Sequence, residues 1–368
     1  MIYIPTHVQI ETVNRFCDAR CPMCTIKFVP DFAKNAPDEL SNNGQSRAAE
    51  IMSLETFKSI AIKFKPYVDR VRFLSLHGCG EPLLDKHLPE KIKFAKDEVG
   101  FKEVGFTSNC SVLTEKMTTR LLEAGLNCII PSIDGLTSEV HEAIRPRTNY
   151  EKIVKNVQNF IVQRDKMNAK CKVLVRMVRQ QLNKDQWDDY NVFWKSLMSP
   201  EKGDDVIGLD IHNTGGKVQN YDEMRVSNFE NMEKEHWDHY TKSVDNGSYK
   251  KLTTPNSNDN KVYVKANEIE DLGGCPDLFS RFSIFASGDV ALCSADQAEY
   301  FKLGNVIKED PIKIFNSNPN SYYNIGGDMF PANLPNGQPK GVLGMGDWVF
   351  EDINGVTPVA VGVYKMRF

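Results

Sequence analysis

Three cysteines close to the N-terminus have the spacing of a metal-binding loop. Cys17, Cys21 and Cys24 lie within eight residues, directly after an apolar, strand-like run. Three thiolates on one short loop can converge on a single cluster, and a four-iron cubane then keeps one iron without a protein ligand. That iron can chelate a small molecule and pass it an electron. A structural zinc site is the alternative; it needs a fourth ligand, from His7 or a distant cysteine.

Apolar runs alternate with helical patterns along the first 211 residues. Strands are predicted over 7–13, 71–78, 101–109, 126–134, 170–178 and 205–211, and helices over 53–64, 88–95, 115–125, 150–166 and 185–197. Strands of the buried type that alternate with helices indicate an α/β protein with a parallel sheet. Six repeats predict a partial (β/α)6, TIM-like barrel, in which the chemistry lies at the carboxyl ends of the strands.

Polar motifs follow those predicted strands. The sequence 77–82 reads His-Gly-Cys-Gly-Glu-Pro after the second strand, Thr-Ser-Asn at 107–109 ends the third, and Ser-Ile-Asp-Gly at 132–135 ends the fourth. Arg176 lies inside the apolar fifth strand and is expected to point into the barrel. Each motif taken alone also suits an ordinary turn, because Gly, Pro, Asn and Asp are common turn residues.

The cysteine spacing together with these strand-end motifs resembles the radical S-adenosylmethionine (radical SAM) superfamily, over roughly residues 6–215. The resemblance implies a [4Fe–4S] cluster held by Cys17, Cys21 and Cys24, with S-adenosylmethionine bound to the open iron. It also implies reductive cleavage of that cofactor to a 5′-deoxyadenosyl radical, which abstracts hydrogen from a substrate. The protein's part is to position the reactants and exclude water.

The resemblance also assigns roles to single residues. The turn at Gly78, Gly80, Glu81 and Pro82 is expected to receive the methionine ammonium group, and Met23 to lie near the adenine. The residues expected to contact the ribose, sulfonium or carboxylate are Asn109, Ser132, Asp134, Arg145 and Arg176. A turn-capping role for the first three and a surface position for Arg145 are the alternatives. The catalytic candidates are Arg176, His212 and Cys79, the last as a hydrogen-atom donor.

A compact unit is predicted near the C-terminal end of the chain. Residues 280–294 alternate as a β-hairpin does, and a turn and helix follow over 303–317. With Cys275 and Cys293 this resembles the start of a SPASM or twitch extension, which implies a second, auxiliary iron–sulfur cluster. No cysteine follows Cys293, so a cysteine pair without metal is the alternative. The expected domains are a core over 1–216, a linker over 217–272, this unit over 273–317 and an unassigned tail over 318–368.

Composition and charge limit the kinds of partner and the location that are expected for this chain. The 368 residues contain 45 basic and 49 acidic side chains, for a net charge of −4, so no nucleic-acid partner is expected. No apolar stretch approaches the length of a membrane span, and the first residues lack the layout of a signal peptide. The expected location is therefore the cytoplasm. There, clustered thiols are metal ligands more often than disulfides.

The substrate is expected to be a peptide or protein, by analogy with relatives that carry such extensions. A radical dehydrogenase of a sugar-like small molecule is the alternative within this class. A non-catalytic iron–sulfur or zinc protein is the alternative outside it. An electron donor such as flavodoxin or ferredoxin is the expected protein partner.

Overall fold

The computed structural model describes residues 4–24, 26, 47–211, 218, 220–226, 280–294, 296–297, 299, 302–316, 348–351 and 359–362 of the chain. His212 and Cys275, as well as most of the predicted linker and tail, lie outside these residues.

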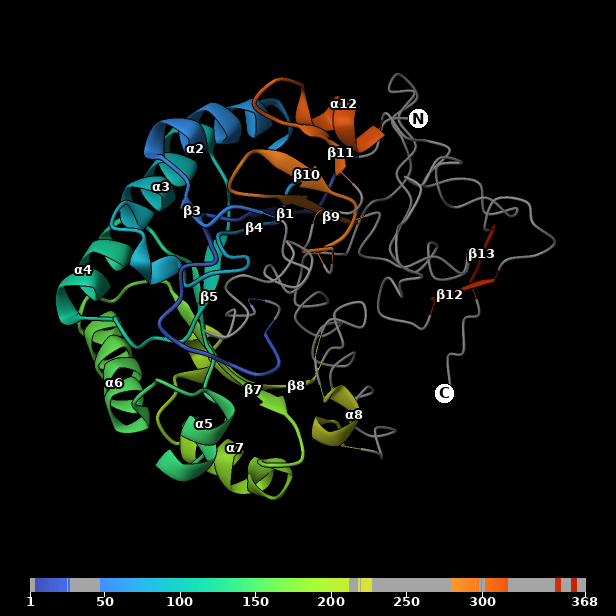
Figure 1. Ribbon diagram of the computed structural model, residues 1–368. Helices are drawn as coiled ribbons and strands as arrows, with labels where there is room; N and C mark the ends of the chain where they lie inside the picture. The colour runs from blue at the N-terminus through green and yellow to red at the C-terminus, as the bar shows by residue number, and fades with distance from the viewer. Residues whose placement is uncertain are drawn as a thin grey trace, which may run out of the picture.

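A nine-stranded, mostly parallel sheet is the centre of the molecule (Figure 1). Its strands are ordered β11-β10-β9-β1-β4-β5-β6-β7-β8. Their bounds are β1 His7–Ile10, β4 Phe73–Ser75, β5 Val104–Ser108, β6 Cys128–Pro131, β7 Lys172–Arg179, β8 Asp205–Asp210, β9 Arg281–Ile284, β10 Asp289–Ala291 and β11 Lys302–Asn305. The run from β9 through β1 to β8 is parallel, and only β9-β10-β11 is antiparallel.

Four short strands stand outside this sheet. They form two antiparallel pairs, β2 Val13–Asn14 with β3 Glu50–Ile51, and β12 Trp348–Glu351 with β13 Val359–Gly362. The strand predicted over 7–13 is therefore two strands, and the one predicted over 71–78 is shorter than expected.

Helices follow the parallel strands and lie in an arc outside them (Figure 1). They are α2 Leu54–Ala61, α3 Leu88–Phe94, α4 Glu115–Glu123, α5 Ser138–Ile144, α6 Tyr150–Lys166 and α7 Trp187–Lys195. Two short helices are separate from this series: α8 Tyr221–Met224, near β8, and α12 Pro311–Asn316, after β11. Side-chain oxygens cap several of these helices at their first turn, because the first backbone N–H groups have no partner within the helix. Ser53 accepts from the N–H of Thr56, and Asn149 from the N–H of Lys152.

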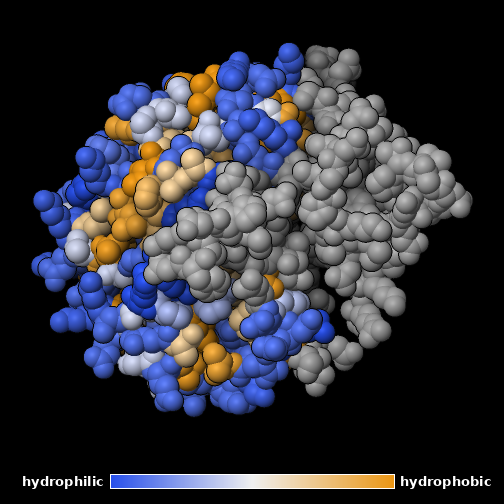
Figure 2. Space-filling view, in the orientation of Figure 1, coloured by the Kyte–Doolittle hydropathy of each residue, from blue (hydrophilic) through white to orange (hydrophobic). Residues whose placement is uncertain are grey.

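The hydrophobic core fills the space between the helices and the outer face of the sheet. Alternate strand residues such as Val8, Leu74 and Phe106 belong to it, together with helix residues such as Phe57 and Phe160. Figure 2 shows mostly hydrophilic side chains on the rim that the helices form, with hydrophobic ones inside that rim. Because strand side chains alternate, the other set of strand residues lines the inner face of the sheet.

These observations confirm the predicted α/β class, with the strands and helices of a partial, TIM-like barrel. In its described part the sheet does not close on itself, because β11 and β8 are its two edges. The hairpin predicted over 280–294 is present as β9 and β10. Its first strand pairs in parallel with β1, and strand β11, which the sequence did not predict, extends the same sheet. None of the described helices is long and apolar enough to cross a membrane.

Candidate active site

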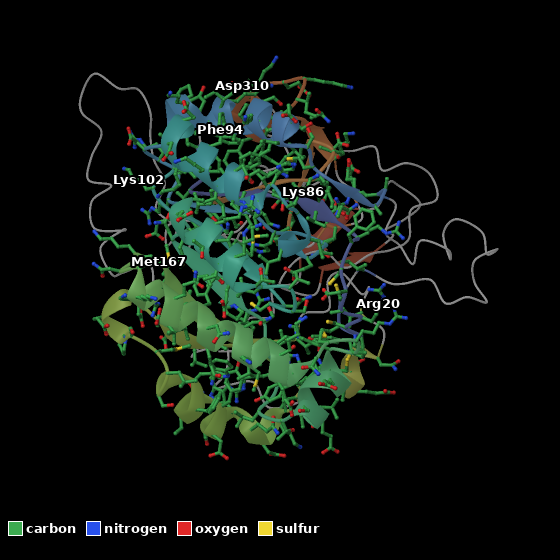
Figure 3. The ribbon with its side chains drawn as sticks, turned by 90° about the vertical axis from the view of Figure 1, so that its left-hand side faces the viewer. Arg20, Lys86, Phe94, Lys102, Met167 and Asp310 are labelled. Atoms are coloured by element: carbon green, nitrogen blue, oxygen red, sulfur yellow. The ribbon has the colours of Figure 1, made fainter. Side chains whose placement is uncertain are left out.

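The cysteine loop lies at the carboxyl ends of the parallel strands. In Figure 3 the loop residue Arg20 is on the opposite side of the molecule from Lys102 and Met167, which come shortly before β5 and β7. Hydrogen bonds hold the loop against its neighbours: the backbone N–H of Glu81 donates to the carbonyl of Phe16 at 2.9 Å, and that of Arg20 to Pro146 at 3.0 Å. The loop is thereby attached to the turns after β4 and after α5.

Each of the three cysteine sulfurs receives one N–H group. Asn109 Nδ2 is 3.7 Å from Cys17 Sγ, Arg145 Nη1 is 3.7 Å from Cys21 Sγ, and the backbone N of Ile26 is 3.4 Å from Cys24 Sγ. N–H groups that point at sulfur stabilise thiolate ligands and tune the metal that they hold. The chemistry of this donor set therefore fits a cluster held by three thiolates.

The three cysteines are half-buried, and their thiols are close enough to influence one another. Burial, with Glu81 as the next cause, raises the pKa of Cys17 to about 12, and burial also raises the pKa of Cys21 and Cys24. Among the described residues, no three His, Cys, Asp or Glu side chains converge closely enough to hold a single metal ion as they stand.

The turn after β4 needs glycine at two positions. A Cβ atom on Gly80 would lie 2.4 Å from the carbonyl oxygen of Val13, and one on Gly78 would lie 2.5 Å from Cγ of Glu11. Neither contact is sterically possible, so the turn fits against β1 and β2 only without side chains at these positions. Its backbone is thus held next to the cysteine loop.

Glu81 braces this turn rather than facing outward. Its carboxylate accepts hydrogen bonds from Ser108 Oγ at 2.7 Å, from the N–H of Asn109 at 2.8 Å and from the N–H of Leu83 at 3.0 Å. The side chain is buried, and burial raises its pKa to about 7. Glu81 therefore joins the turn after β4 to the end of β5.

Asn109 is tied to the cysteine loop by more than its contact with sulfur. Its Nδ2 donates to Asp18 Oδ1 at 2.8 Å, and its Oδ1 accepts from the backbone N–H of Ser111 at 2.9 Å. The hydroxyl of Ser111 donates to the other carboxylate oxygen of Asp18. This network fixes the first cysteine of the loop against the end of β5.

Arg145 is buried, which excludes the surface position that was its alternative. Its Nε donates to Asp134 Oδ2 at 2.7 Å, while its Nη1 faces Cys21. The other oxygen of Asp134 accepts from the N–H of Val178 at 2.7 Å. Burial alone would lower the pKa of Arg145, but Asp134 and Cys21 outweigh it and the pKa is raised. Arg145 is thus a fixed cation beside the loop.

Ser132 and Arg176 form a second pair, on the inner face of the sheet. Arg176 Nη2 donates to Ser132 Oγ at 2.8 Å. Burial, and then the nearby Arg145, lower the pKa of Arg176 to about 10. The expectation that Arg176 points into the barrel agrees with the alternation of β7, whose neighbouring Val175 and Met177 belong to the outer core.

Three further predicted site residues are among the described ones. Cys79 is buried beneath its turn, and its Sγ donates to Gln297 Oε1 at 2.8 Å. Cys293 is half-buried just after the hairpin. Met23 is half-buried within the cysteine loop itself. The structure therefore brings together the loop, the turn after β4, and the ends of β5, β6 and β7.

Sequence reasoning missed a buried ion pair behind this site. Both oxygens of Glu11 bind the guanidinium of Arg47; Glu11 also accepts from the N–H of Cys79 at 2.8 Å and of Ala286 at 3.1 Å. It thus ties β1, the turn after β4 and the hairpin together. The only sequence signal was an acidic residue directly after an apolar strand, and nothing local indicated its partner.

Comparison with known proteins agrees with this geometry. Residues 12–163 match the radical SAM superfamily. A GTP 3′,8-cyclase of Chlorobaculum tepidum is 28% identical over 149 residues, which are 40% of this chain and 39% of that protein. A probable GTP 3′,8-cyclase of Archaeoglobus fulgidus is 30% identical over 155 residues, 42% of this chain and 44% of that protein. The chain thus spans about two fifths of these curated relatives.

Solved structures share the fold at low sequence identity. SuiB of Streptococcus suis, solved bound to the precursor peptide SuiA, aligns with a TM-score of 0.57 and 15% identity, over 86% of this chain and 66% of that one. The enzyme anSMEcpe, solved with bound AdoMet, aligns with a TM-score of 0.56 and 16% identity, over 86% of this chain and 82% of that one.

The mostly parallel half-barrel is the fold that this chain shares with SuiB and anSMEcpe. Residues 12–163 belong to the radical SAM superfamily, which uses a [4Fe–4S] cluster and S-adenosylmethionine. The family and the cofactors inferred from the sequence are thereby confirmed.

Proposed function

We propose that this chain is a radical SAM enzyme in which Cys17, Cys21 and Cys24 hold the [4Fe–4S] cluster. One observation carries the proposal: three thiols on one loop each receive an N–H group, at the carboxyl ends of the strands within the matched region. When bound, the reduced cluster and S-adenosylmethionine supply a carbon radical that abstracts hydrogen. The protein's own residues hold these partners and exclude water from them.

The residues around the loop divide the binding of S-adenosylmethionine among them. Backbone carbonyl groups of the turn over 78–82 accept hydrogen bonds from the ammonium group of the cofactor. Glu81 keeps that turn in place. Arg145 is the cation for the cofactor carboxylate, because it is buried beside Cys21 and held by Asp134. Met23 lies near the adenine, and Ser132 and Asn109 supply polar contacts. Catalytic roles for Arg176, His212 and Cys79 remain predictions.

The substrate proposed first is a peptide or protein, as expected for chains with such a C-terminal unit. A small molecule is the second candidate, because the curated relatives are named as GTP 3′,8-cyclases. Those relatives match only about two fifths of this chain, so they do not decide between the two substrates. An auxiliary cluster at Cys275 and Cys293 remains a prediction, as do the four domain boundaries. An external electron donor would reduce the cluster.

Anaerobic reconstitution with iron and sulfide tests the core of this proposal. The expected result is an iron–sulfur spectrum and release of 5′-deoxyadenosine when S-adenosylmethionine and dithionite are added. Cys21→Ala should abolish that product. Cys128→Ala is the matched control, because Cys128 is a buried thiol at the opposite ends of the strands. Undiminished product from Cys21→Ala, or tetrahedral zinc in an inactive wild-type protein, would contradict the proposal.

A further inference from the structure

The inner face of the sheet carries polar atoms that have no hydrogen-bond partner among the described residues. Five such buried atoms come from different strands or strand ends: Gln9 Oε1, His77 Nδ1, Thr107 Oγ1, Arg176 Nε and Ser283 Oγ. Buried polar groups in folded proteins are nearly always paired, so each unpaired one needs an explanation. A polar ligand bound at this face would pair all five.

Strand register and one hydrogen bond place three of these residues, Gln9, Ser283 and His77, close to one another. Gln9 of β1 lies beside Ser75 of β4 on one side and beside Ser283 of β9 on the other. Its side-chain amide donates to the carbonyl of His77 at 3.2 Å. Two positions before Gln9 in β1, and on the same face of the sheet, His7 lies beside Arg281 of β9. These polar residues therefore share one face of β9, β1 and the end of β4.

Two cations of the described residues lie on this face. Arg176 comes from β7 and Arg281 from β9, and both lie within electrostatic range of His77. Burial, and then these two arginines, lower the pKa of His77 to about 3, and burial lowers that of His7, so both rings are neutral. The strands that supply the group, β1, β4, β5, β7 and β9, contain no Asp or Glu.

Among the described residues, the carboxylate that acts on Arg176 is already engaged. Asp134 is paired with Arg145, and among the described residues Arg176 donates to a neutral hydroxyl, that of Ser132. A guanidinium held away from water without a carboxylate is costly, and a bound anion offsets that cost. The planar fork of arginine also suits the paired oxygens of carboxylate and phosphate groups.

We propose that the inner face between Arg176 and Arg281 binds an anionic group of the substrate, either a carboxylate or a phosphate. Arg145 then serves the cofactor and Arg176 the substrate, so two buried cations have separate partners. The unpaired atoms of Thr107, His77 and Ser283 contact the rest of the same molecule. The role as a substrate site rests on the proposed function, whereas the binding of an anion does not.

Calorimetric titration of the reconstituted protein tests this site. The protein is saturated with S-adenosylmethionine and kept without reductant, so that Arg145 is occupied and no cleavage occurs. One arm uses inorganic phosphate, another glutarate, and a third the uncharged comparator glycerol. We expect saturable binding of phosphate or of glutarate, but not of glycerol. Binding of phosphate alone points to a phosphorylated small molecule, and binding of glutarate alone to a carboxylate, as on an acidic peptide.

Two variants and one control locate the binding. Arg176→Gln and Arg281→Gln should each raise the dissociation constant of the anion by about tenfold or more, as expected for loss of a charge-assisted hydrogen bond. Arg176→Lys, which keeps the charge, should raise this dissociation constant less than Arg176→Gln does. Arg179→Gln is the control: Arg179 is in the same strand but stacks on Trp187, on the outer face, and the variant should bind as the wild type does. Circular dichroism confirms that each variant is folded.

Failure of this inference can be told apart from failure of the proposed function. No binding of either anion, or equal binding by wild type and both glutamine variants, would overturn the anion site even in a protein that cleaves S-adenosylmethionine. Weaker binding of S-adenosylmethionine by Arg176→Gln, with unchanged anion affinity, would instead assign Arg176 to the cofactor and overturn it too. Wild-type protein that binds the anion but never yields 5′-deoxyadenosine would refute the proposed function alone.

Discussion

The ion pair between Asp134 and Arg145 is expected to support both the fold and the cofactor site. The substitution Asp134→Asn keeps the size of the side chain but removes its charge. Asp134 is 0% exposed and Arg145 is 8% exposed, so water cannot replace the lost partner. Leaving one member of a buried pair uncompensated typically lowers the free energy of unfolding by about 3–5 kcal/mol. The hydrogen bond from Val178 to Asp134 is weakened as well.

Urea unfolding followed by circular dichroism measures this loss. The control is Asp97→Asn, because Asp97 pairs with Lys93 on the exposed surface and its loss should leave the unfolding midpoint essentially unchanged. A second variant, Asp134→Asn with Arg145→Met, removes both charges and should recover part of the lost stability. A change under about 1 kcal/mol for Asp134→Asn, or no recovery in the double variant, would refute the reasoning.

Three further predictions follow from single contacts. Burial lowers the pKa of His141 to about 4, so as the pH falls below 6.5 the unfolded chain binds a proton before the folded protein does. The free energy of unfolding should therefore drop by roughly 3 kcal/mol between pH 6.5 and pH 4. Unfolding titrations at several pH values should show a weaker pH dependence for His141→Asn. The same pH dependence in the wild type and in His141→Asn would contradict this prediction. Gly80→Ala places a methyl group against Val13 and should lower the iron content after reconstitution; full iron loading would show that the turn can move. Asn109→Leu removes the N–H group at Cys17, and an EPR redox titration should find the cluster potential more negative; an unchanged potential would exclude that contact.

The cysteine loop and the class of fold could be predicted from the sequence because both are local. Cys17, Cys21 and Cys24 lie on one short loop, so their spacing alone brings the sulfurs together. The alternation of strands and helices shows directly in apolar periodicity, and parallel strands place all their following motifs at one edge of the sheet. Thus the ends of β4, β5 and β6 were expected near the loop, and they are there.

Only the tertiary structure decided which distant residues meet. The sequence left Arg145 open between the surface and the site, and its burial depends on Asp134 and on Cys21, which is 124 positions away. The pairing of Glu11 with Arg47 and the parallel docking of β9 on β1 likewise join segments far apart in the chain. Periodicity describes only near neighbours, whereas the partner of a buried charge is set by how the chain folds back on itself.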